Sequence, residues 1–429
     1  MFGWVDFSEE ERQRAFEIME LARIPGAIDE LGLGTLRDGF SNKLFPGTST
    51  LHTHARYYFL TVYLMKYLEE EYSGHPLETI QHKLTEGEKD TARALIAWAD
   101  NHGRPQTGIT GSGFANTNRW VKQTPTYMNW AAAQTYGLIK DPGLKLNSFL
   151  RVVAHSKPKA TPEDEEFSNS FTSGLWNVPL ECYFQWKAAL QKGEEISLEL
   201  SPEESSQLKN VICQQWPRSL YAALLESPER LLELSEAASL SDGGKSFVQL
   251  ASILQDGNML IRSYDDALVD EASNLSSLAA LLHIRFNYVL ARKAADNAAV
   301  EEREAQWIAN ADPEGLYRER AYRCDLGQCF NLTETSSSMS RNRTTCEFLS
   351  KALEYLKRND LSSLDDLIER REASLKGPAR SKIADAASYV RDSKGNLVSY
   401  GGTELTYRLT DALNLAAEIT APTIRRSEC

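Results

Sequence analysis

The sequence predicts a mainly α-helical, multi-helical fold with one small winged-helix-like α+β segment. Apolar residues recur at helical spacing along most of the chain, and patterns typical of β-strands are sparse. One basic stretch joins a well-capped helix to a hairpin-like pattern, which is the order of elements at the end of a winged helix. With 429 residues, 42% hydrophobic and 25% charged, the chain is long enough for several domains that each bury a core.

Each expected helix follows from an apolar stripe and its flanking residues. The first is expected to begin after Ser8, whose hydroxyl can accept a backbone N–H, and to run to about Leu21. Glu9, Glu10 and Glu11 would be favoured there by the positive end of the helix. Further helices are expected over residues 57–71, 86–101, 202–213, 228–238, 245–254, 275–306, 345–358 and 361–376.

Two polar stretches mark expected linkers, residues 157–166 and residues 333–343, because proline, charge and hydroxyl side chains replace apolar residues there. The predicted organisation has four regions. They are an N-terminal helical region (1–100), a winged-helix-like basic segment (101–156), a central helical region (167–332) and a C-terminal helical region (344–429).

The overall charge limits the possible partners. The formal net charge of −13 argues against a protein that coats nucleic acid or an anionic membrane along its whole length, so any such contact must be local. No apolar stretch reaches the length of a membrane span, and the first twenty residues do not form a secretory signal pattern. Six cysteines without a disulfide framework fit a reducing compartment, so the expected location is the cytoplasm, with no membrane contact.

Two groups of residues in the sequence have side chains of the kinds that bind metals. Cys324, Cys329 and Cys346 do not have the spacing of a zinc knuckle, and no histidine follows nearby, so no metal site is expected. His52 and His54 form a His-x-His pair without an acidic neighbour in the sequence, which is a weak metal signal. The favoured interpretation of that stretch is structural.

In this structural interpretation, Pro46 and Gly47 make a turn, and a following serine or threonine caps the next helix. Arg56, on that helix, is expected to pair with a buried carboxylate.

The sequence contains no recognisable catalytic signature. The glycine-rich stretches 31–34 and 108–113 complete neither a Walker A nor a dinucleotide-binding pattern, and no Gly-x-Ser-x-Gly elbow is present. No catalytic residue, cofactor or metal ligand is therefore assigned. An enzyme is the less favoured interpretation, and a nuclease remains an open alternative.

Charge is segregated in the stretch from Asn101 to Ala160. Eight basic residues stand there against Asp141 alone, a net charge of +7, which leaves −20 for the rest of the chain. A local positive patch on an acidic protein is typical of a surface that contacts a phosphate backbone.

Local chemistry predicts a short helix followed by a hairpin in this stretch. Thr124 is a good N-cap, Pro125 suits the first helical position and Gly137 suits the left-handed residue after the last turn, so a helix is expected over residues 125–136. Residues 138–140, the turn 141–143 and residues 144–153 then predict a β-hairpin.

This arrangement assigns candidate contacts with nucleic acid. Arg119 and Lys122 would approach phosphates, and Lys140 and Lys145 would lie on the wing. On the helix, Met128, Ala131, Ala132 and Thr135 are expected to face inward. The outward face would carry Thr126, Asn129 and Ala133, with Asn129 as a candidate base-edge contact. The alternative is a structural helix-hairpin whose lysines are solvated.

Several motifs resemble an uncharacterised bacterial protein family. They are Trp4–Ser8, Leu31–Gly34 with Arg37 and Asp38, Leu44–Thr50, Ala55–Tyr57, Pro125–Trp130 with Gly137 and Leu138, Arg371–Glu372, Leu375–Lys376 and Ala379–Arg380. The resemblance extends over nearly the whole chain. Members of that family are often encoded beside helicase and phospholipase D-like nuclease genes in antiviral defence islands, which implies a context rather than a chemistry.

The basic patch and this resemblance together predict an accessory nucleic-acid-binding or recruiting subunit of a bacterial antiviral defence system, with the setting implied by the resemblance. The expected partners are DNA and the helicase or nuclease subunits of the same system. The first alternative is an assembly scaffold that binds only proteins and uses the positive patch to dock an acidic partner.

Overall fold

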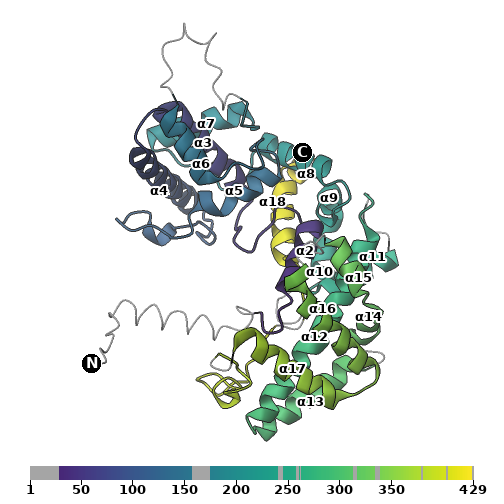
Figure 1. Ribbon diagram of the computed structural model, residues 1–429. Coiled ribbons are helices and arrows are strands. Elements are labelled where there is room, and N and C mark those ends of the chain that lie inside the picture. Colours follow the sequence, from purple (N-terminus) through teal and green to yellow (C-terminus); the bar gives the residue numbers. More distant parts are fainter. Residues whose placement is uncertain are drawn as a thin grey trace, which may run out of the picture. The chain divides into compact units, whose positions relative to one another are not determined.

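The computed structural model describes residues 29–156, 174–239, 245–257, 260, 262–312, 316–333, 339–377, 380–401 and 404–427 (Figure 1). These residues are predominantly helical, which confirms the predicted mainly α class. Within them, strand-type pairing is limited to isolated bridges, which join Ile139 to Trp176, Ser239 to Lys245 and Arg391 to Leu397. Among the same residues, none of the helices combines the length and apolar character that a membrane span requires.

The chain forms two compact units, each made of segments that are distant in the sequence. The first comprises the described residues of Met1–Leu44, Ala237–Gly257 and Asp266–Tyr407. The second comprises those of Phe45–Glu236, Asn258–Asp265 and Arg408–Cys429. The four contiguous regions expected from the sequence do not coincide with these units, because composition along the chain does not show which segments return to an earlier core.

The first unit is built around α12 (Asp266–Lys293), whose residues are buried on nearly all sides between Leu268 and Ala291. A helix that is covered all round must lie at the centre of its unit. The helices that pack on α12 are α2 (Gly34–Leu44), α11 (Phe247–Gly257), α13 (Asn297–Ala311), α14 (Arg318–Arg323), α15 (Leu326–Leu332) and α17 (Leu361–Lys376), and α16 (Met339–Lys357) packs on α14, α15 and α17.

The second unit contains two groups of helices. In one group α3 (Tyr57–Tyr72) is central and contacts α4 (Leu77–Asn101), α5 (Pro125–Thr135), α6 (Leu146–His155) and α7 (Leu180–Lys192). The other group consists of α8 (Pro202–Gln215), α9 (Leu220–Glu226) and α18 (Leu409–Ser427), which contact one another. Helix α10 (Pro228–Ala237) follows α9 directly.

Most expected helices are present within a few residues of their predicted ends, and residues 361–376 match α17. The expected helix 275–306 is wrong, because the chain breaks between α12 and α13. There Ala295 adopts φ 54°, and Asp296 accepts a hydrogen bond from the backbone N–H of Ala299 at 3.0 Å to begin the new helix.

Several expectations fall wholly or partly outside the described residues. The predicted first helix and the linker 157–166 lie outside them. Of the linker 333–343, residues 334–338 also lie outside, but residues 339–343 belong to α16, so the linker prediction is wrong for them.

The predicted β-hairpin is wrong, because residues 146–155 form helix α6 instead of a second strand. Phe149, Leu150 and Val153 are spaced by one and three residues and are buried together, which is a helical rather than an alternating pattern. The preceding Ile139 pairs with Trp176 in an isolated bridge. The described residues therefore contain no wing, and the winged-helix-like segment is corrected to a pair of helices joined by a turn.

Candidate functional site

The helix at the centre of the basic segment begins and ends as its sequence predicts. The Thr124 hydroxyl accepts a hydrogen bond from the backbone N–H of Tyr127 at 3.3 Å, and Pro125 occupies the first helical position. Gly137 has φ 64°, the left-handed conformation expected after the last turn. Helix α5 is thus defined by its own caps.

The exposed face of α5 differs from the prediction. Thr126 and Asn129 are only 1% and 2% exposed, and Ala133 is completely buried. The Asn129 side-chain amide donates a hydrogen bond to the Pro125 carbonyl at 2.8 Å, inside its own helix. The assignment of Thr126 and Asn129 as groove or base-edge contacts is therefore wrong. The exposed large side chain of α5 is Tyr127, at 68%.

A carboxylate of α4 explains why Thr126 is buried. Glu88, itself 3% exposed, accepts the backbone N–H of Thr126 at 3.1 Å and the indole N–H of Trp120 at 2.8 Å. Burial raises the pKa of the Glu88 carboxyl, although these hydrogen bonds act in the opposite direction. Glu88 thus satisfies a free N–H at the start of α5 and fixes that end of the helix to α4.

The four predicted phosphate contacts are accessible. Arg119, Lys122, Lys140 and Lys145 are all exposed. Within the described part of the chain none of them forms an ion pair, whereas Arg104 of the same stretch pairs with Glu199 at 3.1 Å. Arg119 and Lys122 precede α5, and Lys140 and Lys145 follow it. Helix α5, which stands between the two pairs in the sequence, has 11 residues and is therefore about 16 Å long.

A pocket of about 380 Å³ lies elsewhere in the second unit. Its wall is mostly apolar, with Trp98 and Pro422 among the lining residues, and also includes His54, Arg104 and Glu418. The charged groups in this wall already have protein partners, because Arg104 pairs with Glu199 and His54 pairs with Glu418.

Both histidines of the His-x-His pair are held by the fold. His54 Nδ1 lies 2.8 Å from Glu418 Oε1 and its Nε2 lies 3.2 Å from the Thr107 carbonyl oxygen. Burial alone would lower the pKa of His54, but Glu418 and the carbonyl outweigh it and raise the pKa above 6.5. The protonated imidazole satisfies both acceptors, so His54 has no free nitrogen for a metal or a substrate.

His52 is held in the neutral form. Its Nδ1 lies 3.0 Å from the Tyr58 hydroxyl and its Nε2 lies 3.1 Å from the Met128 carbonyl oxygen. Burial lowers its pKa to about 4. The neutral ring therefore donates from Nε2 to the carbonyl and accepts the Tyr58 hydroxyl at Nδ1.

The expected partner of Arg56 is present. Its guanidinium Nε lies 3.2 Å from Glu204 Oε2, and the Glu204 side chain is completely buried. The expected serine or threonine cap is absent, because Arg56 itself occupies the N-cap position without a side-chain cap. Instead, Glu418 of α18 accepts the backbone N–H of Ala55 at 2.7 Å just before α3.

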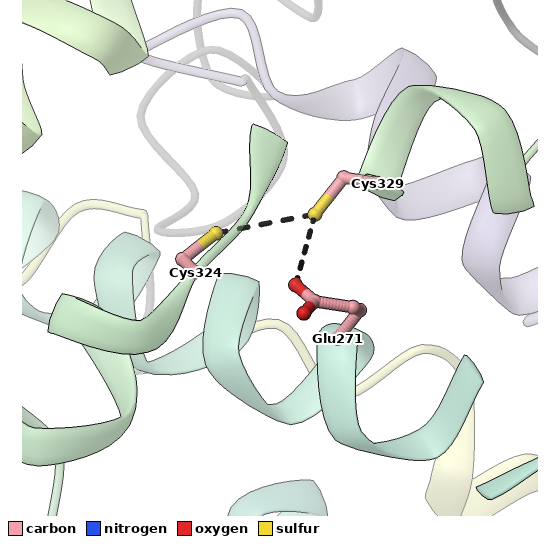
Figure 2. A group of neighbouring side chains, drawn as sticks. All are labelled: Glu271, Cys324 and Cys329. Carbon is pink, nitrogen blue, oxygen red and sulfur yellow. Dashed lines mark hydrogen bonds between the residues drawn. The ribbon is translucent and has the colours of Figure 1, made fainter. Parts of the chain in front are cut away.

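Three side chains of the kinds that bind metals lie together in the first unit. They belong to Glu271, Cys324 and Cys329, and we call this group the Cys–Glu cluster. Figure 2 shows the two sulfurs and the carboxylate pointing toward one another from α12, the end of α14, and α15. All three residues are buried. Cys346, which follows the two cysteines in the sequence and was considered with them, is not part of the cluster. No spacing rule could have linked Glu271 to Cys324, because 53 residues separate them.

Comparison with known proteins adds a partial family match. The model of a family of unknown function (DUF6361) matches residues 1–197. No curated protein and no solved structure matches the chain. The resemblance to an uncharacterised family is thus supported over residues 1–197, less than half of the chain, and the match carries no information about neighbouring genes.

Proposed function

We propose that this protein is an accessory nucleic-acid-binding subunit that contacts the phosphate backbone through Arg119, Lys122, Lys140 and Lys145. The observation that carries the proposal is that these four exposed cations have no ion-pair partner among the described residues, in a protein whose net charge is −13. Cations that are not neutralised internally are available to displace the counterions of a polyanion.

The burial of Thr126 and Asn129 changes the kind of recognition that we propose. With these two polar side chains buried, α5 loses the groups that were expected to read base edges in a groove. Its exposed large side chain is Tyr127, and an exposed aromatic ring among basic residues suits stacking with an unpaired base. The proposed ligand is therefore a nucleic acid bound with little sequence preference, with single strands preferred over duplex.

The proposed setting is a bacterial antiviral defence system in the cytoplasm, with helicase or nuclease subunits as partners. This part of the proposal is supported by the resemblance of the sequence motifs described above. A scaffold that binds only proteins is the alternative outcome of the binding test.

The test is fluorescence anisotropy of labelled single-stranded and duplex DNA over a salt series. Binding that weakens steeply with salt is expected, with tighter binding to the single strand. The variant Arg119→Glu with Lys122→Glu should abolish it. The control Lys192→Glu with Arg230→Glu makes the same change in net charge at exposed basic residues outside the segment and should bind normally.

Absence of DNA binding by the wild-type protein at low salt would overturn the proposal and favour the protein-only scaffold. Equal loss of binding in both charge-reversal variants would also overturn it, because total charge rather than this surface would then govern binding. Replacement of Tyr127 by alanine should weaken binding to the single strand more than binding to the duplex.

A further inference from the structure

The Cys–Glu cluster brings three soft or anionic ligand atoms together inside the first unit. Cys324 Sγ lies 3.9 Å from Cys329 Sγ, and Cys329 Sγ lies 3.7 Å from Glu271 Oε2. The one ligand atom that each residue offers lies within 4.8 Å of the other two. Cys329 is completely buried, and Cys324 and Glu271 are 6% and 8% exposed.

The separation of the two sulfurs and that of Cys329 from Glu271 match those between the ligands of a tetrahedral zinc ion. Zinc–sulfur bonds of about 2.3 Å at a tetrahedral angle place two sulfurs about 3.8 Å apart. A zinc–oxygen bond of about 2.0 Å places the oxygen about 3.5 Å from each sulfur. The observed 3.9 Å and 3.7 Å differ from these values by only a few tenths of an ångström.

The surroundings of the cluster leave its negative charge uncompensated. Within the described part of the chain, no lysine or arginine forms an ion pair with Glu271. Its carboxylate instead accepts the backbone N–H of Asp325 at 3.1 Å and a hydrogen bond from the Cys329 thiol. A buried carboxylate beside two thiols is unfavourable without a cation, and a divalent ion bound to all three would remove that penalty.

We propose that Glu271, Cys324 and Cys329 bind a zinc-type divalent cation. Two thiolates and one carboxylate supply three ligands, and a water molecule or another non-protein ligand completes the tetrahedron. Binding releases the two thiol protons as the two zinc–sulfur bonds form. The ion would join α12 to the end of α14 and to α15, and would therefore stabilise the first unit.

The carboxylate of Glu271 distinguishes the proposed metal site from a simple pair of thiols. Two neighbouring cysteines could also form a disulfide, in which two sulfurs lie about 2.05 Å apart and no third ligand takes part. Glu271 has no function in a disulfide, whereas it completes a set of three metal ligands. The proposal therefore predicts that Glu271 matters as well as the cysteines.

The test measures metal content and binding in the full-length protein purified under reducing conditions. Elemental analysis should find about one zinc ion per chain after addition of zinc and removal of the excess. Cobalt(II) added to metal-free protein should give the visible bands of a tetrahedral site and a thiolate charge-transfer band. In a competition with a chromophoric chelator, Cys324→Ser, Cys329→Ser and Glu271→Gln should each weaken zinc binding by at least about 10-fold.

Matched controls are Cys346→Ser, which removes a cysteine of the first unit outside the cluster, and Cys213→Ser, which removes a buried cysteine of the second unit. Both should bind zinc like the wild type. Circular dichroism checks that each variant folds. If a variant does not fold, the cobalt spectrum of the wild-type protein still tests the proposed site. A wild-type protein that binds neither ion, an intact disulfide between Cys324 and Cys329, or equal losses in the controls would overturn the proposal.

Discussion

The guanidinium of Arg56 lies 3.2 Å from the carboxylate of Glu204, across 148 residues of sequence. The carboxylate is fully buried, also accepts the Tyr63 hydroxyl at 3.0 Å, and forms a capping box with Ser201 at the start of α8. A buried charge in this position depends on its partner, because the loss of one member leaves the other uncompensated.

Replacement of Arg56 by methionine should therefore destabilise the protein by about 3–5 kcal/mol, since Glu204 would remain buried without a cation. Adding Glu204→Gln should recover part of the loss, because glutamine is neutral and can still form the capping box. Denaturant unfolding of the two single variants and the double variant measures the coupling. A double variant that loses the sum of both single effects would show that the pair is not coupled.

The pair of His54 and Glu418 should make stability depend on pH. The pKa of His54 is raised above 6.5 in the folded state, so its protonated form contributes stability that is complete below pH 6.5. This contribution is lost as the pH rises through the folded pKa. His54→Gln should therefore lower the unfolding free energy by about 0.5–1 kcal/mol at about pH 6, and by less at about pH 9. A loss that is equal at both pH values would contradict the assignment.

Gly47 should tolerate no side chain. It has φ 76°, and a Cβ atom would lie 2.5 Å from Cζ of Tyr136, a fully buried ring. Gly193 has a similar φ of 68° but nothing within 4 Å of its Cβ position, which makes it a matched control. Gly193→Ala should lose about 1 kcal/mol from backbone strain alone, and Gly47→Ala clearly more because of the clash. Equal losses in thermal unfolding would show that the Tyr136 ring can move aside.

A substitution at the break between α12 and α13 should raise the unfolding free energy, whereas the preceding substitutions lower it. Ala295 adopts φ 54°, which glycine accepts without strain, so Ala295→Gly should raise the unfolding free energy by up to about 1 kcal/mol. The same substitution at Ala305, in the middle of α13, should lower it by about 0.5–1 kcal/mol. If both variants lost stability equally, the chain would be helical through residue 295, as its periodicity suggests.

The lysines that follow α5 should contribute to the salt dependence of DNA binding. Replacing Lys140 and Lys145 by glutamine should reduce the slope of the logarithm of affinity against the logarithm of salt concentration by up to about 2, since each phosphate contact contributes about 0.9 on duplex DNA. The salt series measures this slope directly. An unchanged slope would remove these two lysines from the contact surface.

The sequence by itself determined the mainly α class and the ends of several helices. The caps of α5 at Thr124 and Gly137 and the ends of α17 follow from propensity and capping, which act over a few residues. The need of Arg56 for a buried carboxylate was also predictable, because a charged side chain beside an apolar helix requires a partner. The identity of that partner, Glu204, was not.

Tertiary structure alone decided which face of α5 is buried and which distant residues meet. Thr126 and Asn129 look like surface residues, but both are buried, and Glu88 from α4 accepts the backbone N–H of Thr126. Residues 144–153 fit a hairpin after a turn, yet Phe149, Leu150 and Val153 bury together only as a helix. Glu271 lies beside Cys324 and Cys329 because α12 packs against α14 and α15, a contact that depends on the packing of the whole unit and is invisible in any local pattern.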